Sequence, residues 1–176
     1  NDGGTLSNSF ALMKVRWNGV MVEASPLAFE RLKELYRDNT RAELHNVAIA
    51  NYDGEIEFNE SGELLGNGDV ALVSSTKDEE VSRWDSLNIP FKKIKAPCIR
   101  FDTLLKNSQY KNFDFLTIDI EGMELEVLPQ INFNELGIRL ACIEWNSKEK
   151  EKYDDIMLPY GFRLIHQNAE NLIYAK

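Results

Sequence analysis

Two carboxylates follow an apolar run near the middle of the chain, at a position that predicts chemistry. Residues 115–118 are mostly apolar on both faces of an extended segment, as in a central strand that helices cover on both sides. Asp119 follows directly and Glu121 lies two positions later. In an open α/β sheet the crevice lies beyond the carboxyl ends of the strands, so polar residues there face a ligand. We therefore expect Asp119 and Glu121 to act on a bound substrate.

A second apolar run also has an acidic residue near its end. Residues 139–145 predict another strand, and Glu144 lies near its carboxyl end. A carboxylate can remove a hydroxyl proton, so Asp119 is the expected base or substrate anchor, and Glu121 and Glu144 are expected to share that task. The alternative is that the three residues hold a divalent cation, because hard cations prefer carboxylate oxygens.

A helix is expected to follow over residues 121–128. It would place Glu121 in its first turn, where the helix dipole favours an anion. Glu124 and Glu126 are expected to be charges at the helix start and on its solvated face.

Glu23 is the candidate for binding a nucleoside. It ends a predicted strand over residues 19–24, twenty positions after Gly3, and an acid at this spacing accepts hydrogen bonds from both ribose hydroxyls of a cofactor. The alternative is a capping carboxylate for the helix that begins at Ser25-Pro26.

Composition limits the classes of partner. The 176 residues fit one domain, and 43% of them are hydrophobic. A net charge of −9 argues against nonspecific binding to nucleic acid or to an anionic membrane. The chain contains no apolar run of the roughly 20 residues that a membrane-spanning helix needs. We expect a cytoplasmic protein with a small-molecule partner, and the sequence leaves its oligomeric state open.

Helical and extended patterns alternate along the chain. The expected helices include residues 10–17 and 25–36, and a strand over 43–50 is expected to form a hairpin with residues 55–58. Residues 59–97 form an elaborated segment with a short candidate strand over 70–74.

The chain ends with two β-rich runs, over residues 160–166 and 171–175. The four residues between them are too few for a helical crossover, so these strands must pair antiparallel. Together these patterns predict a single α/β domain over residues 1–176.

Four ordered segments resemble the FkbM family of S-adenosylmethionine-dependent methyltransferases. They are Val22-Glu23-Ala24-Ser25-Pro26, Asn46-Val47-Ala48-Ile49, Phe101-Asp102-Thr103-Leu104-Leu105 and Asp119-Ile120-Glu121-Gly122-Met123-Glu124. The resemblance implies a Rossmann-like class I methyltransferase sheet, mostly parallel with a C-terminal antiparallel hairpin, in an α/β/α sandwich. Asn1-Asp2-Gly3-Gly4 resembles only the tail of the glycine loop that follows the family's first strand. The first strand is therefore expected to be missing from the chain.

The resemblance also implies a cofactor site and a reaction. The cofactor would be S-adenosylmethionine, bound by Asp2, Gly3, Ser7, Asn8, Glu23, Ala24, Ser25, Asn46, Ala48 and Asp119. Asn46 and Ala48 would border the adenine, or else serve only an edge strand. The reaction would be in-line transfer of a methyl group to a hydroxyl oxygen of a sugar or another small natural product, with residues 59–97 selecting the acceptor.

Three rival functions remain for the same residues. They are a metal-dependent hydrolase, a nicotinamide oxidoreductase and a catalytically inert domain. The full Gly-x-Gly-x-x-Gly turn expected for a nicotinamide dinucleotide is absent.

Overall fold

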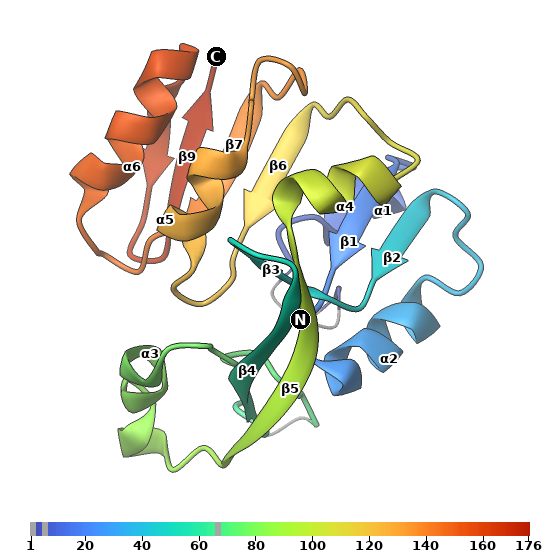
Figure 1. Cartoon of the computed structure of the whole chain (residues 1–176), viewed down its shortest axis with the longest axis vertical. Helices are drawn as coiled ribbons and strands as arrows, with labels where there is room; N and C mark the ends of the chain where they lie inside the picture. Colours follow the sequence, from blue (N-terminus) through green and yellow to red (C-terminus); the bar gives the residue numbers. More distant parts are fainter. Residues whose placement is uncertain (1–2, 5–6, 66–67) are drawn as a thin grey trace.

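Helices and strands alternate along most of the chain (Figure 1). The structure, a computed structural model, describes residues 3–4, 7–65 and 68–176. The helices are α1 Phe10–Lys14, α2 Pro26–Leu35, α3 Asp78–Ser82, α4 Phe101–Asn107, α5 Glu124–Val127 and α6 Lys150–Met157, with 3-10 turns at Asp85–Leu87, Leu128–Gln130 and Leu158–Tyr160. The strands are β1 Gly19–Val22, β2 Ala42–His45, β3 Ala48–Ala50, β4 Gly54–Ser61, β5 Phe91–Arg100, β6 Phe115–Ile118, β7 Leu140–Glu144, β8 Arg163–Gln167 and β9 Asn171–Ala175.

The strands form three small sheets where the sequence predicted one. β1 and β2 pair parallel, and a second sheet has the order β6-β7-β9-β8. In that second sheet β6 and β7 are parallel, and β8 and β9 form the antiparallel hairpin that the sequence predicted. The third sheet has the order β3-β5-β4. The mixed α/β class is confirmed, but a continuous, mostly parallel sheet is not present in the described part of the chain.

The sheet of β1 and β2 is separate from the sheet of β6, β7, β9 and β8. No described strand pairs with β1 on the side away from β2, or with β6 on the side away from β7. A cavity lined by residues of both strands separates them. The amides of Gly19 and Glu23 donate to carbonyls of residues 41 and 45, next to and within β2. Successive amides of a strand point in alternate directions, so the amides of Val20 and Val22 point away from β2. A single sheet across this interval would need one more strand.

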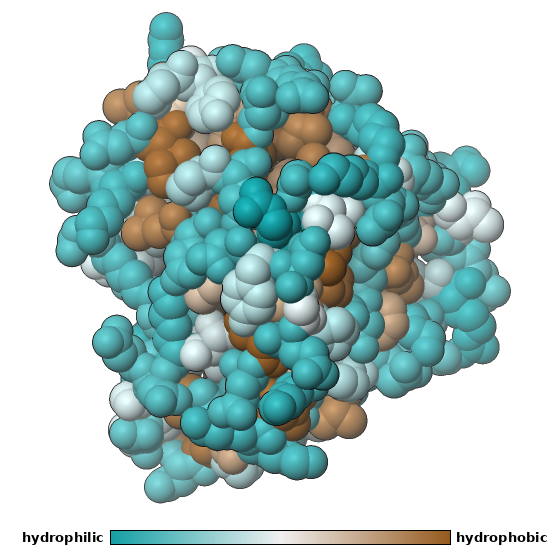
Figure 2. Space-filling model, in the orientation of Figure 1, coloured by the Kyte–Doolittle hydropathy of each residue, from teal (hydrophilic) through white to brown (hydrophobic). Residues whose placement is uncertain are grey.

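The main core lies around the four-stranded sheet. Phe133 is fully buried there and makes edge-to-face contacts with Tyr160 and Phe162, at ring centroid distances of 5.1 Å and 5.4 Å. A smaller cluster of Met13, Leu32 and Tyr36 packs beside β1 and β2. Hydrophilic residues cover most of the face shown in Figure 2, and hydrophobic residues lie in recesses between them. No described helix is long and apolar enough to cross a bilayer.

The expected strand over residues 43–50 is wrong, because it is divided between two sheets. The side-chain amide of Asn46 donates to the backbone oxygens of Glu23 at 2.8 Å and Ala24 at 3.2 Å. These bonds tie the chain to the loop after β1, so β2 ends at His45 and β3 joins β5 instead.

The expected hairpin with residues 55–58 is also wrong. β5 inserts between β3 and β4. Every residue of β4 pairs with β5, and the two strands are antiparallel. Residues 70–74 form no strand either, and Ala71 has a left-handed φ of 59°.

We predict that hydrogen exchange will report the open side of β1. Met21 faces β2 and its amide should be protected, whereas the amides of Val20 and Val22 should exchange on the order of tenfold faster or more. Amide exchange followed by NMR compares these neighbours within one strand, so each serves as the control for the others. Equal protection of all three amides would mean that the open side of β1 is covered.

Candidate active site

A cavity of about 1070 Å³ lies where β1, β6 and β7 end. Its apolar part is lined by residues of β1 and β6, including Val22 and Ile118. Its polar part is lined by Glu23 after β1 and by acidic residues after β6 and at the end of β7. The polar end is thus at the carboxyl edge of the parallel strands, where α/β sheets bind ligands.

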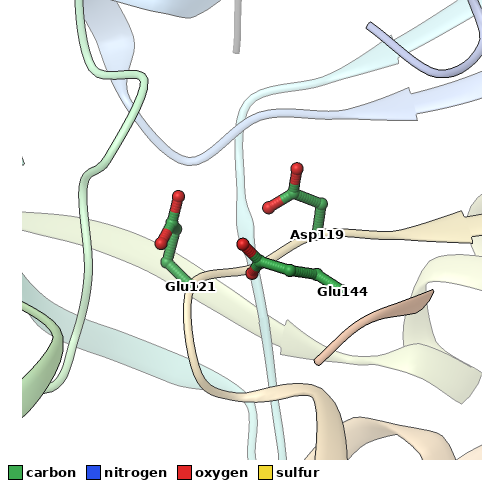
Figure 3. Close-up of side chains that lie close together, drawn as sticks. All are labelled: Asp119, Glu121 and Glu144. Carbon is green, nitrogen blue, oxygen red and sulfur yellow. The ribbon is translucent and has the colours of Figure 1, made fainter. Parts of the chain in front are cut away.

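Asp119, Glu121 and Glu144 meet at this polar end (Figure 3). Each offers a carboxylate oxygen, and these oxygens lie within 4.8 Å of one another. The parallel register pairs Ile118 with Ile143, which brings the next residue of each strand side by side. The structure therefore brings together the three residues that the sequence predicted as catalytic. We call them the acid cluster.

The helix expected over residues 121–128 is wrong at its start. Glu121 and Gly122 have left-handed φ angles of 51° and 105°, so α5 begins only at Glu124. Glu121 therefore lies on a turn between β6 and α5, outside the first helical turn where the helix dipole acts. A left-handed residue other than glycine costs free energy and is found mainly where the surrounding contacts enforce it.

Glu124 is one of those contacts. It is 2% exposed, and its Oε1 accepts hydrogen bonds from the amides of Ile120 at 2.9 Å and Gly122 at 3.2 Å. Its expected place on a solvated face is wrong, because the carboxylate folds back to satisfy the turn that carries Glu121. Glu126 is exposed, as predicted, and pairs with Lys77 at 3.0 Å.

Crowding changes the protonation of the acid cluster. Burial, with repulsion from Asp119 and Glu121, raises the pKa of Glu144 to about 10. Burial, with repulsion from Asp119 and Glu124, raises the pKa of Glu121 to about 8. Glu144 therefore keeps its proton at neutral pH, and Glu121 is mostly protonated there and loses its proton in mildly alkaline solution.

Asp119 is the more acidic partner of Glu144. It is exposed to the cavity, yet desolvation by the surrounding protein raises its pKa, and a hydrogen bond from Glu144 opposes that rise. Glu144 Oε2 is buried with no hydrogen-bond partner among the described residues. An ionised oxygen there would be costly to bury, which agrees with a Glu144 that keeps its proton.

The elaborated segment supplies the opposite wall of the cavity. Ser75 Oγ donates to the backbone oxygen of Glu121 at 2.6 Å. Thr76, Arg83 and Trp84 line the cavity beside it. Ser75 and Arg83 were not predicted as neighbours of the acid cluster, because neither lies in a recognisable sequence motif.

Glu23 lies at the other side of the polar end. Its Oε1 accepts from the Ser25 amide at 2.6 Å, as a capping carboxylate would, and the residue also lines the cavity. Ala24 and Ala48 line the cavity near it.

Ser25 and Asn46 lie outside the described cavity lining, where they hold the loop after β1. The Ser25 hydroxyl accepts from the Ala28 amide at 3.2 Å, as the N-cap of α2, and donates to Glu60 at 2.5 Å. Asn46 bonds to the backbone of the same loop.

The amino-terminal candidates are placed in part. Asp2 lies outside the described residues, whereas Gly3, Ser7 and Asn8 line the cavity. Gly3 has a φ of 75°, at which another residue would be strained, and a Cβ atom there would lie 2.3 Å from Leu32 Cδ1, so the Leu32 side chain would have to shift. Asn8 donates to Thr117 Oγ1 at 3.4 Å, which brings this segment to β6.

Comparison with known proteins gives one family and one solved structure. Residues 1–164 match the family described as Methyltransferase FkbM domain. The fold is similar to the crystal structure of Methyltransferase FkbM from Methylobacillus flagellatus KT, with a TM-score of 0.57 and 14% sequence identity. The match covers 99% of this chain and 42% of the Methylobacillus chain, so this chain spans less than half the length of that relative. Among curated proteins, none matches the chain.

The raised pKa values predict a loss of stability with rising pH. A carboxyl whose pKa is higher in the folded state stabilises the fold fully below its unfolded value, and this stabilisation is lost as pH rises through the folded value. With Glu121 titrating at about 8 and Glu144 at about 10, the melting temperature should fall from about pH 5.5 to about pH 9.

The matched test is the Glu144→Gln variant, which removes the buried acid without changing its shape. Its melting temperature should fall less over the same pH range than that of the parent protein. Glu57→Gln, at an exposed glutamate, makes the same formal charge change and should retain the parent slope. An unchanged slope in Glu144→Gln would contradict the raised pKa of Glu144.

Proposed function

The chain belongs to the FkbM methyltransferase family, and from this premise we propose that it transfers a methyl group from S-adenosylmethionine to a hydroxyl oxygen of a sugar or another small natural product. The observation that carries the proposal is the acid cluster at the polar end of a cavity that Glu23 also lines. S-adenosylmethionine supplies an electrophilic methyl group when bound. The acid cluster supplies oxygens that can bind a hydroxyl and accept its proton.

The residues present fit the cofactor. The cavity, at about 1070 Å³, is as large as known small-molecule sites. Glu23 would hold the ribose hydroxyls, and the small side chains of Ala24 and Ala48 leave room beside it for the base. Asn46 and Ser25 would act by shaping that loop. Gly3, Ser7, Asn8, Asp2 and Asp119 are the proposed contacts for the methionine part.

The acid cluster would divide the work on the acceptor among its members. Glu144 keeps its proton and donates to Asp119, which holds Asp119 in place as the anchor for the acceptor hydroxyl. Glu121, with a pKa of about 8, is the proposed base, because proton transfer is most efficient when the pKa of the base lies near the working pH. Alignment of the hydroxyl contributes most of the remaining acceleration.

Calorimetry with S-adenosylhomocysteine tests the cofactor assignment. We predict micromolar binding by the parent protein and its loss in Glu23→Ala, because the ribose would lose the carboxylate that accepts both hydroxyls. Glu30→Ala removes an exposed acid on the adjacent helix and should bind as the parent does. Equal binding by the parent and Glu23→Ala, with unchanged melting temperatures, would overturn the role of Glu23. Binding by neither protein would favour the inert domain.

A divalent cation is the second candidate ligand of the acid cluster. The observation that favours it is three carboxylate oxygens within 4.8 Å, a donor set that suits a hard cation. This donor set would serve a metal-dependent hydrolase, or a methyltransferase that binds its acceptor through the metal. In either case all three carboxylates would have to be ionised.

EDTA and added Mg²⁺ distinguish a methyltransferase without a metal from a site that binds a divalent cation. We predict that binding of S-adenosylhomocysteine is unchanged by EDTA and that Mg²⁺ alone gives no calorimetric signal at the acid cluster, because Glu144 retains its proton. Mg²⁺ binding that disappears in Glu144→Gln and persists in Glu57→Gln would favour the metal site instead. The acceptor and the cytoplasmic location stay predictions of the sequence.

A further inference from the structure

Glu80 is a buried carboxylate that the proposed chemistry does not use. It lies in α3, within the elaborated segment, and is only 5% exposed. Its Oε2 pairs with Arg83 Nη1 at 2.5 Å, and its Oε1 pairs with Lys148, which lies 68 residues away in the loop after β7. One carboxylate therefore joins the elaborated segment to the strand that ends in Glu144.

Glu80 also packs against the turn that carries Glu121. A Cβ atom on Gly122 would lie 3.0 Å from Glu80 Cγ, so the glycine permits this close approach. Ser75 fixes the same turn through its bond to the Glu121 backbone oxygen. The elaborated segment thus contacts the turn that carries Glu121 and the loop that follows Glu144.

The two partners of Glu80 are the cations that act on these acids. Arg83 interacts electrostatically with Glu121 and Glu144, and Lys148 with Glu124. Burial alone would raise the pKa of Glu80, but its bonds to Lys148 and Arg83 outweigh burial and lower it, so Glu80 is ionised. Both cations are therefore already engaged by a carboxylate outside the acid cluster.

We propose that Glu80 is a positioning residue that engages Arg83 and Lys148 and holds the elaborated segment against the turn after β6 and the loop after β7. It keeps Arg83 from pairing with Glu121 or Glu144, and Lys148 from pairing with Glu124. The inference rests on the proposed function, in which Glu121 accepts the acceptor proton. A direct Arg–carboxylate pair would favour ionised Glu121 and make it a weaker base. Glu80 prevents that pairing, and the elaborated segment remains closed over the cavity.

The charged groups that face Glu121 come from several elements. Those that act on it are Asp119, Glu124 and Glu144 from the carboxyl edge of the sheet, and Glu80 and Arg83 from the elaborated segment. Glu80 opposes ionisation of Glu121 and Arg83 favours it. Removing Glu80 should therefore lower the titration midpoint of Glu121, and removing Arg83 should raise it. A general loss of structure would not shift the midpoint in two opposite directions.

Carbon-13 NMR of the side-chain carboxyls measures this titration without cofactor or acceptor. The Glu121 signal is assigned by its loss in Glu121→Gln. In Glu80→Gln we expect the Glu121 midpoint to fall by roughly half to one pH unit, and in Arg83→Gln to rise by a similar amount. Glu79→Gln, an exposed neighbour on α3, should leave the midpoint unchanged.

Two results in these variants would contradict the proposed role of Glu80. A midpoint that does not move in Glu80→Gln, or that moves the same way in both variants, would overturn the proposal. If Glu80→Gln does not fold, Glu80→Asp decides instead, because it keeps the charge but shortens the side chain that reaches Arg83 and Lys148. A lower Glu121 midpoint in Glu80→Asp then supports the proposal, and an unmoved midpoint overturns it. Because no cofactor is present, failure here is distinct from failure of the cofactor test on Glu23.

Discussion

The structure depends on the crowding of three carboxylates at one edge of a sheet. The parallel register of β6 and β7 places Asp119 beside Glu144, and the turn after β6 adds Glu121. Three ionised groups at this distance would repel one another strongly in a partly buried site. The retained proton of Glu144 removes much of that repulsion, and it leaves Asp119 and Glu121, the proposed anchor and the proposed base, with different pKa values.

Other parts of the chain maintain this arrangement. Glu124 accepts the amides of the turn after β6, and Ser75 holds the Glu121 backbone oxygen from the opposite wall. Glu80 links that wall to Lys148 in the loop after β7. Segments far apart in the sequence thus hold the side chains at this one sheet edge in place. This is the pattern expected where strained backbone, such as left-handed Glu121, carries a function.

The sequence predicted the parts of the site that depend on local pattern. The strands before Asp119 and up to Glu144 are visible as short apolar runs, and the C-terminal hairpin is visible from the short segment that joins its two β-rich runs. The left-handed turn at Glu121, the buried place of Glu124 and the division of residues 43–50 by Asn46 were not predicted. Each depends on a hydrogen bond to a partner whose position only the folded chain defines. The role of Glu80 was not predicted for the same reason, because Lys148, one of its two cation partners, lies 68 residues away.

A crystal structure of the protein with bound S-adenosylhomocysteine would show directly which residues hold the cofactor. We expect the ribose hydroxyls on the Glu23 carboxylate and the sulfur directed toward Asp119, Glu121 and Glu144, with no metal ion between these three residues. A ligand bound away from Glu23, or an acid cluster closed around a metal ion, would contradict this expectation.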